Sequence, residues 1–487
     1  MQEINIVLEA VKSVIAIVYN FLWGDLLTIP LPGGETLGLS LLVMILIPSG
    51  IYFTIKTRFM PFRFFPEMLR ITMEKKHGDD KHSLSGFQAL IVSTATRVGM
   101  GNLVGVVAAI SAGGAGAVFW MWLTAILSSS TAFIEATLAQ IYKEKDPLYG
   151  GYRGGPAYYI HAYFKKEKFC SSNNSESEVN ENKNKFWKSH SVIAVLFALS
   201  GLICWGGISQ VIGNSVSSAF ETAFNVPPLY STIVLVVLSS IIVLRKYATV
   251  KVLDVVVPIM AAIYFLFTIV VIVMNLGQIP EVFERIFAEA FGIRQIAAGG
   301  FGAVLMNGAK RGLFSNEAGS GSAPCAAAAA DVDQPAKAGI LQAFGVFIDT
   351  IVICTCTAMI ILLTPAGVSG ELTGMPLLQA AMEHHFGMFG VVFIAVILFL
   401  FSFSTFLGVL FYARSNVSYI FGDNWTSQTV YKVIALLMLF IGGLASYTFV
   451  WDLGDIGIAL MTIFNMIALF PLSKEALKAL NEYKKIK

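Results

Sequence analysis

The sequence predicts an all-α polytopic membrane protein with about eleven transmembrane helices. Hydrophobic residues fill 56% of its 487 positions and charged residues only 13%, whereas soluble domains carry about 25% charged residues. The apolar residues form stretches of about 20, the length that spans the hydrocarbon core as a helix. Lysines and arginines gather in alternate segments between these stretches, as they do in cytoplasmic loops. Most of the chain is therefore expected to lie in lipid.

Eleven stretches meet the length and hydropathy of a membrane span. They cover residues 36–56, 87–111, 116–141, 191–220, 229–246, 252–275, 296–328, 338–363, 388–412, 430–449 and 453–472. Alternate connecting segments hold 27 of the 33 lysines and arginines. Because basic residues are retained in the cytoplasm, we expect a multi-pass protein of the cell (inner) membrane. The N-terminus is expected outside and the C-terminal tail in the cytoplasm.

Other features of the composition exclude several classes of protein. A net charge of +2 gives no sign of a nucleic-acid partner, and no obligatory protein partner is indicated. The five cysteines show no CxxC spacing and are interpreted as small core residues rather than as disulfides or metal ligands. The apolar run Val14–Leu27 follows acidic residues and is interrupted by Asp25, which favours an interfacial helix over a cleaved signal.

Some charged residues fall inside the expected spans. The basic ones are Arg97, Lys310 and Arg311, and the acidic candidates for pairing with them are Glu135, Glu317 and Asp349. A charged side chain at mid-bilayer costs at least about 2.5 kcal/mol, so it normally faces a polar cavity or a partner. These residues are either structural ion pairs that fix helix packing or parts of a gate or coupling network. We take Arg97, Arg311, Glu317 and Asp349 as candidates for the second role.

Two spans contain runs that a continuous helix would avoid, Ser93–Asn102 and Gly312–Pro324. Their glycines weaken a helix and allow close approach to a ligand. Irregular backbone at membrane depth is tolerated only beside a cavity or inside protein. The GxxxG spacing from Gly101 to Gly105, taken alone, favours helix packing instead.

The two interrupted spans occupy matching places in the chain. If residues 36–56 form an extra helix, ten spans remain, and the interrupted ones are the first and the sixth. Two halves of five then have opposite orientation, as in transporters with inverted repeats. The expected regions are an extracytoplasmic interfacial segment 1–35, an extra helix 36–56, a basic cytoplasmic loop 57–86, a first repeat 87–275 with a cytoplasmic loop 143–190, a second repeat 276–472 and a basic cytoplasmic tail 473–487.

Several motifs in these spans resemble a known family. They are VGMGNLVGVVAAI (98–110), GGAGAVFWMW (113–122), GGPAYYI (154–160), RGLFSNEAGSGSAP (311–324) and GVFIDTIVICT (345–355). In this order they look like the signatures of the alanine or glycine:cation symporters. The resemblance implies a LeuT-type five-plus-five inverted repeat with one extra N-terminal helix. It also implies sodium-driven, sometimes proton-driven, uptake of alanine, glycine or a close relative.

The resemblance also implies which residues bind the amino acid. From the first broken helix these are Thr96, Gly99, Gly101 and Asn102, and from the sixth repeat helix Phe314, Ser315 and Asn316. The amides after Gly99 and Gly101 would meet the substrate carboxylate. Gln210 and Asn214, one turn apart, would face the pocket from the third repeat helix, although such amides also form bonds across helix interfaces.

A sodium ion in this fold lies between the first and eighth repeat helices. The resemblance assigns it the carbonyls of Ala95, Val98 and Phe401 and the hydroxyls of Ser404 and Thr405. These are hard oxygen ligands suited to a small cation. The alternative is that the two hydroxyls only bond their own helix.

The chain departs from the family pattern at a few positions. Met100 stands where the family usually has threonine, and Ala115 where it usually has proline. Val409 and Leu410 replace residues that are often aromatic or polar. The expected pocket is therefore more apolar than usual, and one sodium is expected rather than two.

Other functions fit the sequence less well than sodium-coupled import by alternating access. An enzyme is not expected, because the histidines fall in loops or at their edges and no hydrolase motif is present. A channel would need a repeated filter or polar stripe. The alternatives kept within transporters are a symporter for another small solute such as serine and a proton-coupled variant.

Overall fold

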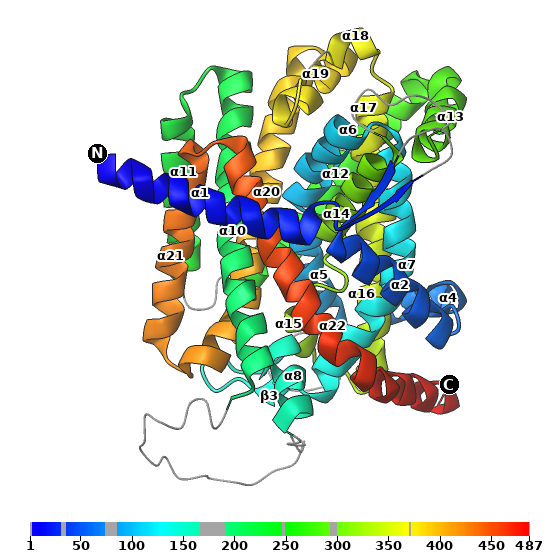
Figure 1. Ribbon diagram of the computed structural model, residues 1–487, viewed down its shortest axis with the longest axis vertical. Coiled ribbons are helices and arrows are strands. Elements are labelled where there is room, and N and C mark those ends of the chain that lie inside the picture. Colours follow the sequence, from blue (N-terminus) through cyan, green and yellow to red (C-terminus); the bar gives the residue numbers. More distant parts are fainter. Residues whose placement is uncertain are drawn as a thin grey trace.

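Helices make up almost all of the computed structural model (Figure 1). The structure describes residues 2–30, 36–73, 85–165, 190–245, 249–292, 300–369 and 372–486. The polar stretch 170–188 of the expected cytoplasmic loop lies outside these residues. Two small antiparallel hairpins, β1 (Leu27–Pro30) with β2 (Thr36–Leu39) and β3 (Glu144–Lys145) with β4 (Tyr152–Arg153), are additions to the all-helical expectation.

The N-terminal part consists of α1 (Gln2–Trp23), α2 (Leu41–Lys56), α3 (Met60–Arg63) and α4 (Phe65–Thr72). Helix α1 runs crosswise to the helices of the bundle and contacts α22 and α2 (Figure 1). It lies within the interfacial segment expected at residues 1–35. The hairpin after it packs β2 against α14.

The rest of the described chain forms helices of very different length. The first group is α5 (Gly86–Arg97), the π-helical η1 (Gly101–Gly105), α6 (Val106–Gly113), α7 (Gly116–Ile141), α8 (Pro156–Lys165), α10 (Val192–Phe224), α11 (Pro228–Val243) and α12 (Thr249–Met274). The second is η3 (Leu276–Gln278), α13 (Ile279–Ala290), α14 (Phe301–Asn316), α15 (Ala323–Ala328), α16 (Pro335–Val346), the π-helical η4 (Phe347–Cys354), α17 (Thr355–Leu362), α18 (Ala366–Ser369), α19 (Met375–Phe386), α20 (Met388–Phe421), α21 (Trp425–Leu444) and α22 (Tyr447–Ile486).

Every expected span overlaps helix in the described structure, but the first, 36–56, begins in β2 and continues as the 16-residue α2. Within the described ranges, seven helical stretches are long and apolar enough to cross a membrane unaided. They are 116–141, 192–224, 255–274, 335–362, 388–421, 425–444 and 447–486. The last continues through the expected tail, because residues 473–486 remain helical.

Two helices organise the interior. Helix α10 packs against α20, α21 and α22, and α7 packs against α14 and α16. The start of α5 is fixed by a capping box, in which Ser85 accepts from the Gln88 amide and the Gln88 side chain bonds back to Ser85. The helices that pack around α7 and α10 enclose the two interrupted helices.

Candidate functional site

The first interrupted helix breaks between α5 and η1. Helix α5 ends at Arg97, and the chain turns through Val98, Gly99 and Met100 before η1 begins. The amide of Gly99 donates to Oδ1 of Asn102 at 3.0 Å, so this side chain closes the turn. A Cβ at Gly101 would lie 3.4 Å from Cα of Ser315, so the first break packs closely on α14.

The second interrupted helix breaks between α14 and α15. Glu317 has a φ of +56°, and Gly319 and Gly321 have φ values of +97° and +86°, all in the left-handed region. A Cβ at Gly321 would also lie 2.5 Å from Pro156, so a larger residue is excluded there twice over. Both breaks are buried, which is the arrangement that irregular backbone needs at membrane depth.

A polar cluster around Asp349, hereafter the Asp349 cluster, joins the two breaks. Nδ2 of Asn102 donates to Oδ1 of Asp349 at 2.6 Å, and the hydroxyl of Ser315 donates to Oδ2 at 3.0 Å. The Thr350 hydroxyl donates to the same Oδ2 at 2.7 Å, and Nδ2 of Asn316 reaches that hydroxyl at 3.3 Å. Asp349 is fully buried in η4, so its carboxylate depends on these neutral donors.

Glu135 of α7 supports the second break from the other side. Its carboxylate accepts from the Gly319 amide at 3.1 Å and from Nδ2 of Asn465 at 2.9 Å. Asn465 of α22 also donates to the Gly319 carbonyl and accepts from the Tyr159 hydroxyl. The irregular backbone is therefore satisfied by side chains from two other helices, α7 and α22.

The residues expected to hold sodium lie partly together. Thr405 of α20 accepts from the Met100 amide at 3.2 Å, so α20 meets the first break directly. The hydroxyls of Ser404 and Thr405 both donate to the Phe401 carbonyl, at 2.9 and 2.8 Å. Val98 is buried at the break. The side chains of Ala95 and Thr96 lie outside the described residues, although their backbone is helical.

The two amides expected on the pocket side of α10 contact α21 instead. Gln210 donates to the sulfur of Met438 at 3.1 Å, and Asn214 donates to the Ala445 carbonyl at 2.7 Å. The face of α10 nearest Phe314 carries Gly207 and Val211, which approach Gly454. Residues 210 and 214 share a face as expected, but in this conformation that face packs on a neighbouring helix.

An ion group lies beside Phe314, toward the end of α14 that adjoins α1. Arg311 binds Asp455 of α22 through two hydrogen bonds of 3.0 and 2.8 Å, and Nζ of Lys310 lies 3.4 Å from the same carboxylate. The Arg311 guanidinium also stacks over Trp451 at 4.0 Å, and Trp451 packs against Phe314. All three charged side chains are buried, and they join α14 to α22.

Helix α1 covers this ion group. The Tyr19 hydroxyl accepts from Lys310 at 2.6 Å, and the Trp23 indole donates to the Asp455 carbonyl at 3.0 Å. Trp23 is itself almost fully buried. Helix α1 thus places Tyr19 against α14 and Trp23 against α22, the two helices that carry the ion group.

Of the other candidate gate residues, Arg97 is the least satisfied. It is fully buried and donates to the Gln342 carbonyl at 3.1 Å, while Nε and Nη2 find no hydrogen-bond partner in the described structure. Glu317 forms the left-handed turn that ends α14, and its carbonyl accepts from Ser320. Arg97 therefore supplies positive charge between α5 and α16 without a direct ion pair.

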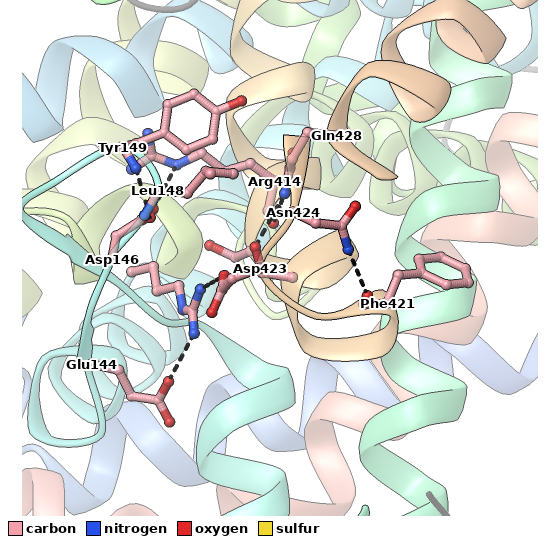
Figure 2. Close-up of polar contacts among 12 residues, drawn as sticks. Glu144, Asp146, Leu148, Tyr149, Arg414, Phe421, Asp423, Asn424 and Gln428 are labelled. Carbon is pink, nitrogen blue, oxygen red and sulfur yellow. Dashed lines mark hydrogen bonds and ion pairs between the residues drawn. The ribbon is translucent and has the colours of Figure 1, made fainter. Parts of the chain in front are cut away.

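A second ion network lies at the far ends of α7 and α20. Figure 2 shows the loop after α7, where Glu144 and Asp146 approach α20 and the turn that follows it. Arg153 pairs with Asp423 and, at 3.4 Å, with Glu144, and Arg414 lies 4.0 Å from Asp146. Burial raises the pKa of Glu144 above its ordinary value, and Arg153 offsets part of that rise.

Sequence reasoning missed Asp455, Asn465 and Thr350. Asp455 and Asn465 are polar residues within a membrane-length helix, which is a signal that could have marked them. Among the departures from the family pattern, Ala115 donates its amide to Glu289 at 2.5 Å, a bond that proline cannot make. Met100 is buried within the break, as expected for a more apolar pocket.

Comparisons with known proteins find relatives of this chain in one family. The model of the sodium:alanine symporter family matches residues 33–487. The probable sodium/glutamine symporter GlnT of Bacillus subtilis is 40% identical over 91% of this chain and 88% of its own. The amino-acid carrier AlsT of the same organism is 39% identical over 91% and 89%. The sodium/alanine symporter AgcS of Methanococcus maripaludis is 33% identical over 97% and 98%.

A manganese transporter of Eremococcus coleocola has a similar fold. The TM-score is 0.50 at 13% identity, over 85% of this chain and 79% of that one. At this identity the likeness concerns the fold alone.

Proposed function

The chain belongs to the sodium:alanine symporter family, and we propose that it imports a small neutral amino acid, alanine or glycine, together with sodium. Membership makes it a membrane symport protein for amino acids and sodium rather than an enzyme, and thereby bears out the resemblance seen in the sequence. The observation that carries the proposal is the Asp349 cluster, in which Asn102 of one broken helix and Ser315 of the other bind one carboxylate.

We place the substrate between the two breaks. The N-terminus of η1 begins there, and the partial positive charge of a helix N-terminus attracts a carboxylate. The amides after Gly99 and Gly101 are the proposed donors, and Asn102 lies beside them. Phe314, packed on Trp451, gives the site an apolar wall, which suits a small side chain.

Cation coupling is proposed to use the oxygens on both sides of the first break. Sodium is held by the carbonyls of Ala95, Val98 and Phe401 with the hydroxyls of Ser404 and Thr405, which suits a hard cation. Asp349 supplies the negative charge near this site. In a proton-coupled variant, Asp349 is the group that would take the proton, because it is a buried carboxylate held only by neutral donors.

Alternating access is proposed to work by breaking one of two closed layers at a time. The outer layer is the Arg311–Asp455 pair covered by α1, and the inner layer is the network of Arg153, Asp423 and Arg414. With the N-terminus outside the cell membrane, the ion group faces the exterior. The outer layer lies on α14 and α22, and the inner layer lies at the ends of α7 and α20.

Uptake into proteoliposomes tests the proposal. Labelled alanine, glycine, serine and glutamine are compared under an inward sodium gradient, an inward proton gradient and neither. Accumulation of alanine or glycine above the outside concentration, only with sodium, supports the proposal. Sodium-dependent accumulation of glutamine alone would assign the chain a larger substrate, and passive equilibration of all four would make it a channel.

A further inference from the structure

A cavity of about 340 Å³ lies outside the proposed transport path, between α3, α4, α7 and the α16–η4 segment. Its walls include Phe62, Phe65, Ile126, Phe347 and Ile351. The volume falls within the range of about 300–1,000 Å³ that small-molecule ligands occupy in proteins. It is therefore large enough to take part of a ligand rather than a single water.

The chemistry of the walls selects hydrocarbon. The one hydroxyl in the lining, that of Ser129, already donates to the Ala343 carbonyl at 3.1 Å. Phe65 meets Phe347 edge-on with ring centres 5.2 Å apart, which builds an aromatic side to the cavity. Apolar cavities of this kind stay dry and accept apolar molecules. An amino-acid substrate would find no partner for its charges there.

The edge of the cavity is basic. Arg58 and Arg63 flank the two lining residues Pro61 and Phe62, and Arg63 donates to the Arg58 carbonyl at 3.2 Å. Nζ of Lys484, from the end of α22, lies 5.5 Å from the ring centre of Phe64. Partial burial and the charges of Arg63 and Arg58 lower the pKa of Lys484, so the three cations act on one another.

Exposed aromatic residues accompany these cations. Phe59 and Phe62 are 54% and 60% exposed, although both are large and apolar. Aromatic and basic side chains gather where a protein meets the headgroup region of a bilayer. Segment 57–63 therefore has the composition of a membrane interface, with an apolar cavity directly below it.

We propose that the cavity holds an acyl chain of an anionic phospholipid whose phosphate lies at Arg58 and Arg63. Basic residues next to a membrane attract anionic lipids, and the apolar walls accept the chain. The two parts of one lipid thus match the two parts of the site. A free phosphate would contact only the arginines, and an uncharged hydrocarbon would contact only the apolar walls.

Occupancy acts on the transport machinery through η4. Phe347 and Ile351 lie one turn apart on η4 and line the cavity, while Asp349 between them is buried on the opposite face. A lipid chain against the outer face braces the segment that holds the Asp349 cluster. Only this consequence rests on the proposed function; the binding itself does not.

The test of binding uses purified full-length protein and phosphatidylglycerol, measured by native mass spectrometry after delipidation and titration. The double variant R58Q/R63Q is compared with R245Q/K478Q, which removes two charges from residues on the same proposed side of the membrane. Each basic residue contributes about fivefold to such binding, or about 1 kcal/mol, so R58Q/R63Q should bind about thirtyfold more weakly. Ala125→Leu, which fills the cavity, should also weaken binding without changing charge.

Several outcomes would overturn the proposal. Equal binding by R58Q/R63Q and wild type, or an equal loss in R245Q/K478Q, would exclude a headgroup site at these arginines. Binding of phosphatidylcholine as tight as that of phosphatidylglycerol would exclude charge selection. If inorganic phosphate alone displaced the lipid completely, the acyl chain would have no part in the site.

The consequence for transport is measured in vesicles of phosphatidylcholine with and without phosphatidylglycerol. We expect faster uptake by wild type with phosphatidylglycerol, and no such gain for R58Q/R63Q. Specific binding with equal uptake in both vesicles would overturn the bracing of η4. Failure of uptake in every lipid would instead refute the proposed function and leave the binding result standing.

Discussion

Replacement of Asp349 by asparagine tests the centre of the proposed mechanism. The side chain keeps its shape and one carbonyl oxygen but loses its charge. In the structure its carboxylate accepts from Asn102 at 2.6 Å, Ser315 at 3.0 Å and Thr350 at 2.7 Å. The variant therefore removes charge from the cluster while most of the packing remains.

The size of the effect depends on where the cation lies. Two unit charges about 4 Å apart interact by about 4 kcal/mol at an effective dielectric constant of about 20, and by about 2 kcal/mol at about 8 Å. A cation bound directly by Asp349 would then lose about a thousandfold in affinity, since about 1.4 kcal/mol is tenfold. A cation bound about 8 Å from Asp349 would lose about thirtyfold.

The assay is sodium-dependent uptake of alanine over a range of sodium concentrations. We expect Asp349→Asn to raise the half-saturating sodium concentration by about thirtyfold, in line with a cation about 8 Å from Asp349. Glu383→Gln removes an exposed acid from α19 and serves as the control. An unchanged half-saturating concentration in Asp349→Asn would refute a role for this charge in cation binding.

Three other substitutions probe the remaining contacts. Thr405→Val removes the hydroxyl that meets the Met100 amide, and we expect at least a tenfold rise in half-saturating sodium in the same uptake assay. Glu135→Gln weakens the charge-assisted bond to Gly319, so the maximal uptake rate should fall about tenfold with half-saturating sodium unchanged; a change in sodium dependence would contradict this. Trp23→Ala removes a side chain of α1 that covers the ion group. Cys204, which is buried near Gly454 in the wild type, should then react faster with an impermeant maleimide added outside. An unchanged rate of reaction would contradict the role of α1 as a cover.

Hydropathy was sufficient to predict the bounds of some helices but not of others. Helix α7 begins and ends at the expected residues, 116 and 141. Helix α22 extends beyond its expected end because the tail is amphipathic and packs inward, as when Tyr483 bonds Glu67. A window of mean hydropathy detects where the apolar run ends in α22, but it does not detect where the helix ends.

The breaks were expected from glycine, but glycine has two uses in this chain. Gly312, expected within the second break, lies inside α14, where a Cβ would come 2.7 Å from the Thr124 hydroxyl. It is required for close packing on α7, and the break begins only at Glu317. The pattern of residues located the interruption to within one turn but could not separate packing glycines from turning ones.

The partners of polar residues were harder to predict than their positions. The spacing of Gln210 and Asn214 places them on one face of α10, but only the tertiary structure shows that this face meets α21. Arg311 was recognised as an unusual charge, whereas its partner Asp455 lies 144 residues away. Local periodicity carries no information on such a pairing, because it depends on how two distant helices cross.

Helix α14 gives a physical reason for the outer layer to respond to the centre. Arg311 and Ser315 lie one turn apart on it, so one rigid element carries both the outer ion pair and a donor to Asp349. Glu317 and Gly319 then end the helix, and Glu135 holds the chain beyond that point. A close-packed helix does not stretch, so a movement of α14 that separates Arg311 from Asp455 also shifts Ser315 against Asp349. Under the proposed mechanism, loading of the centre and opening of the outer layer are therefore coupled through the geometry of one helix.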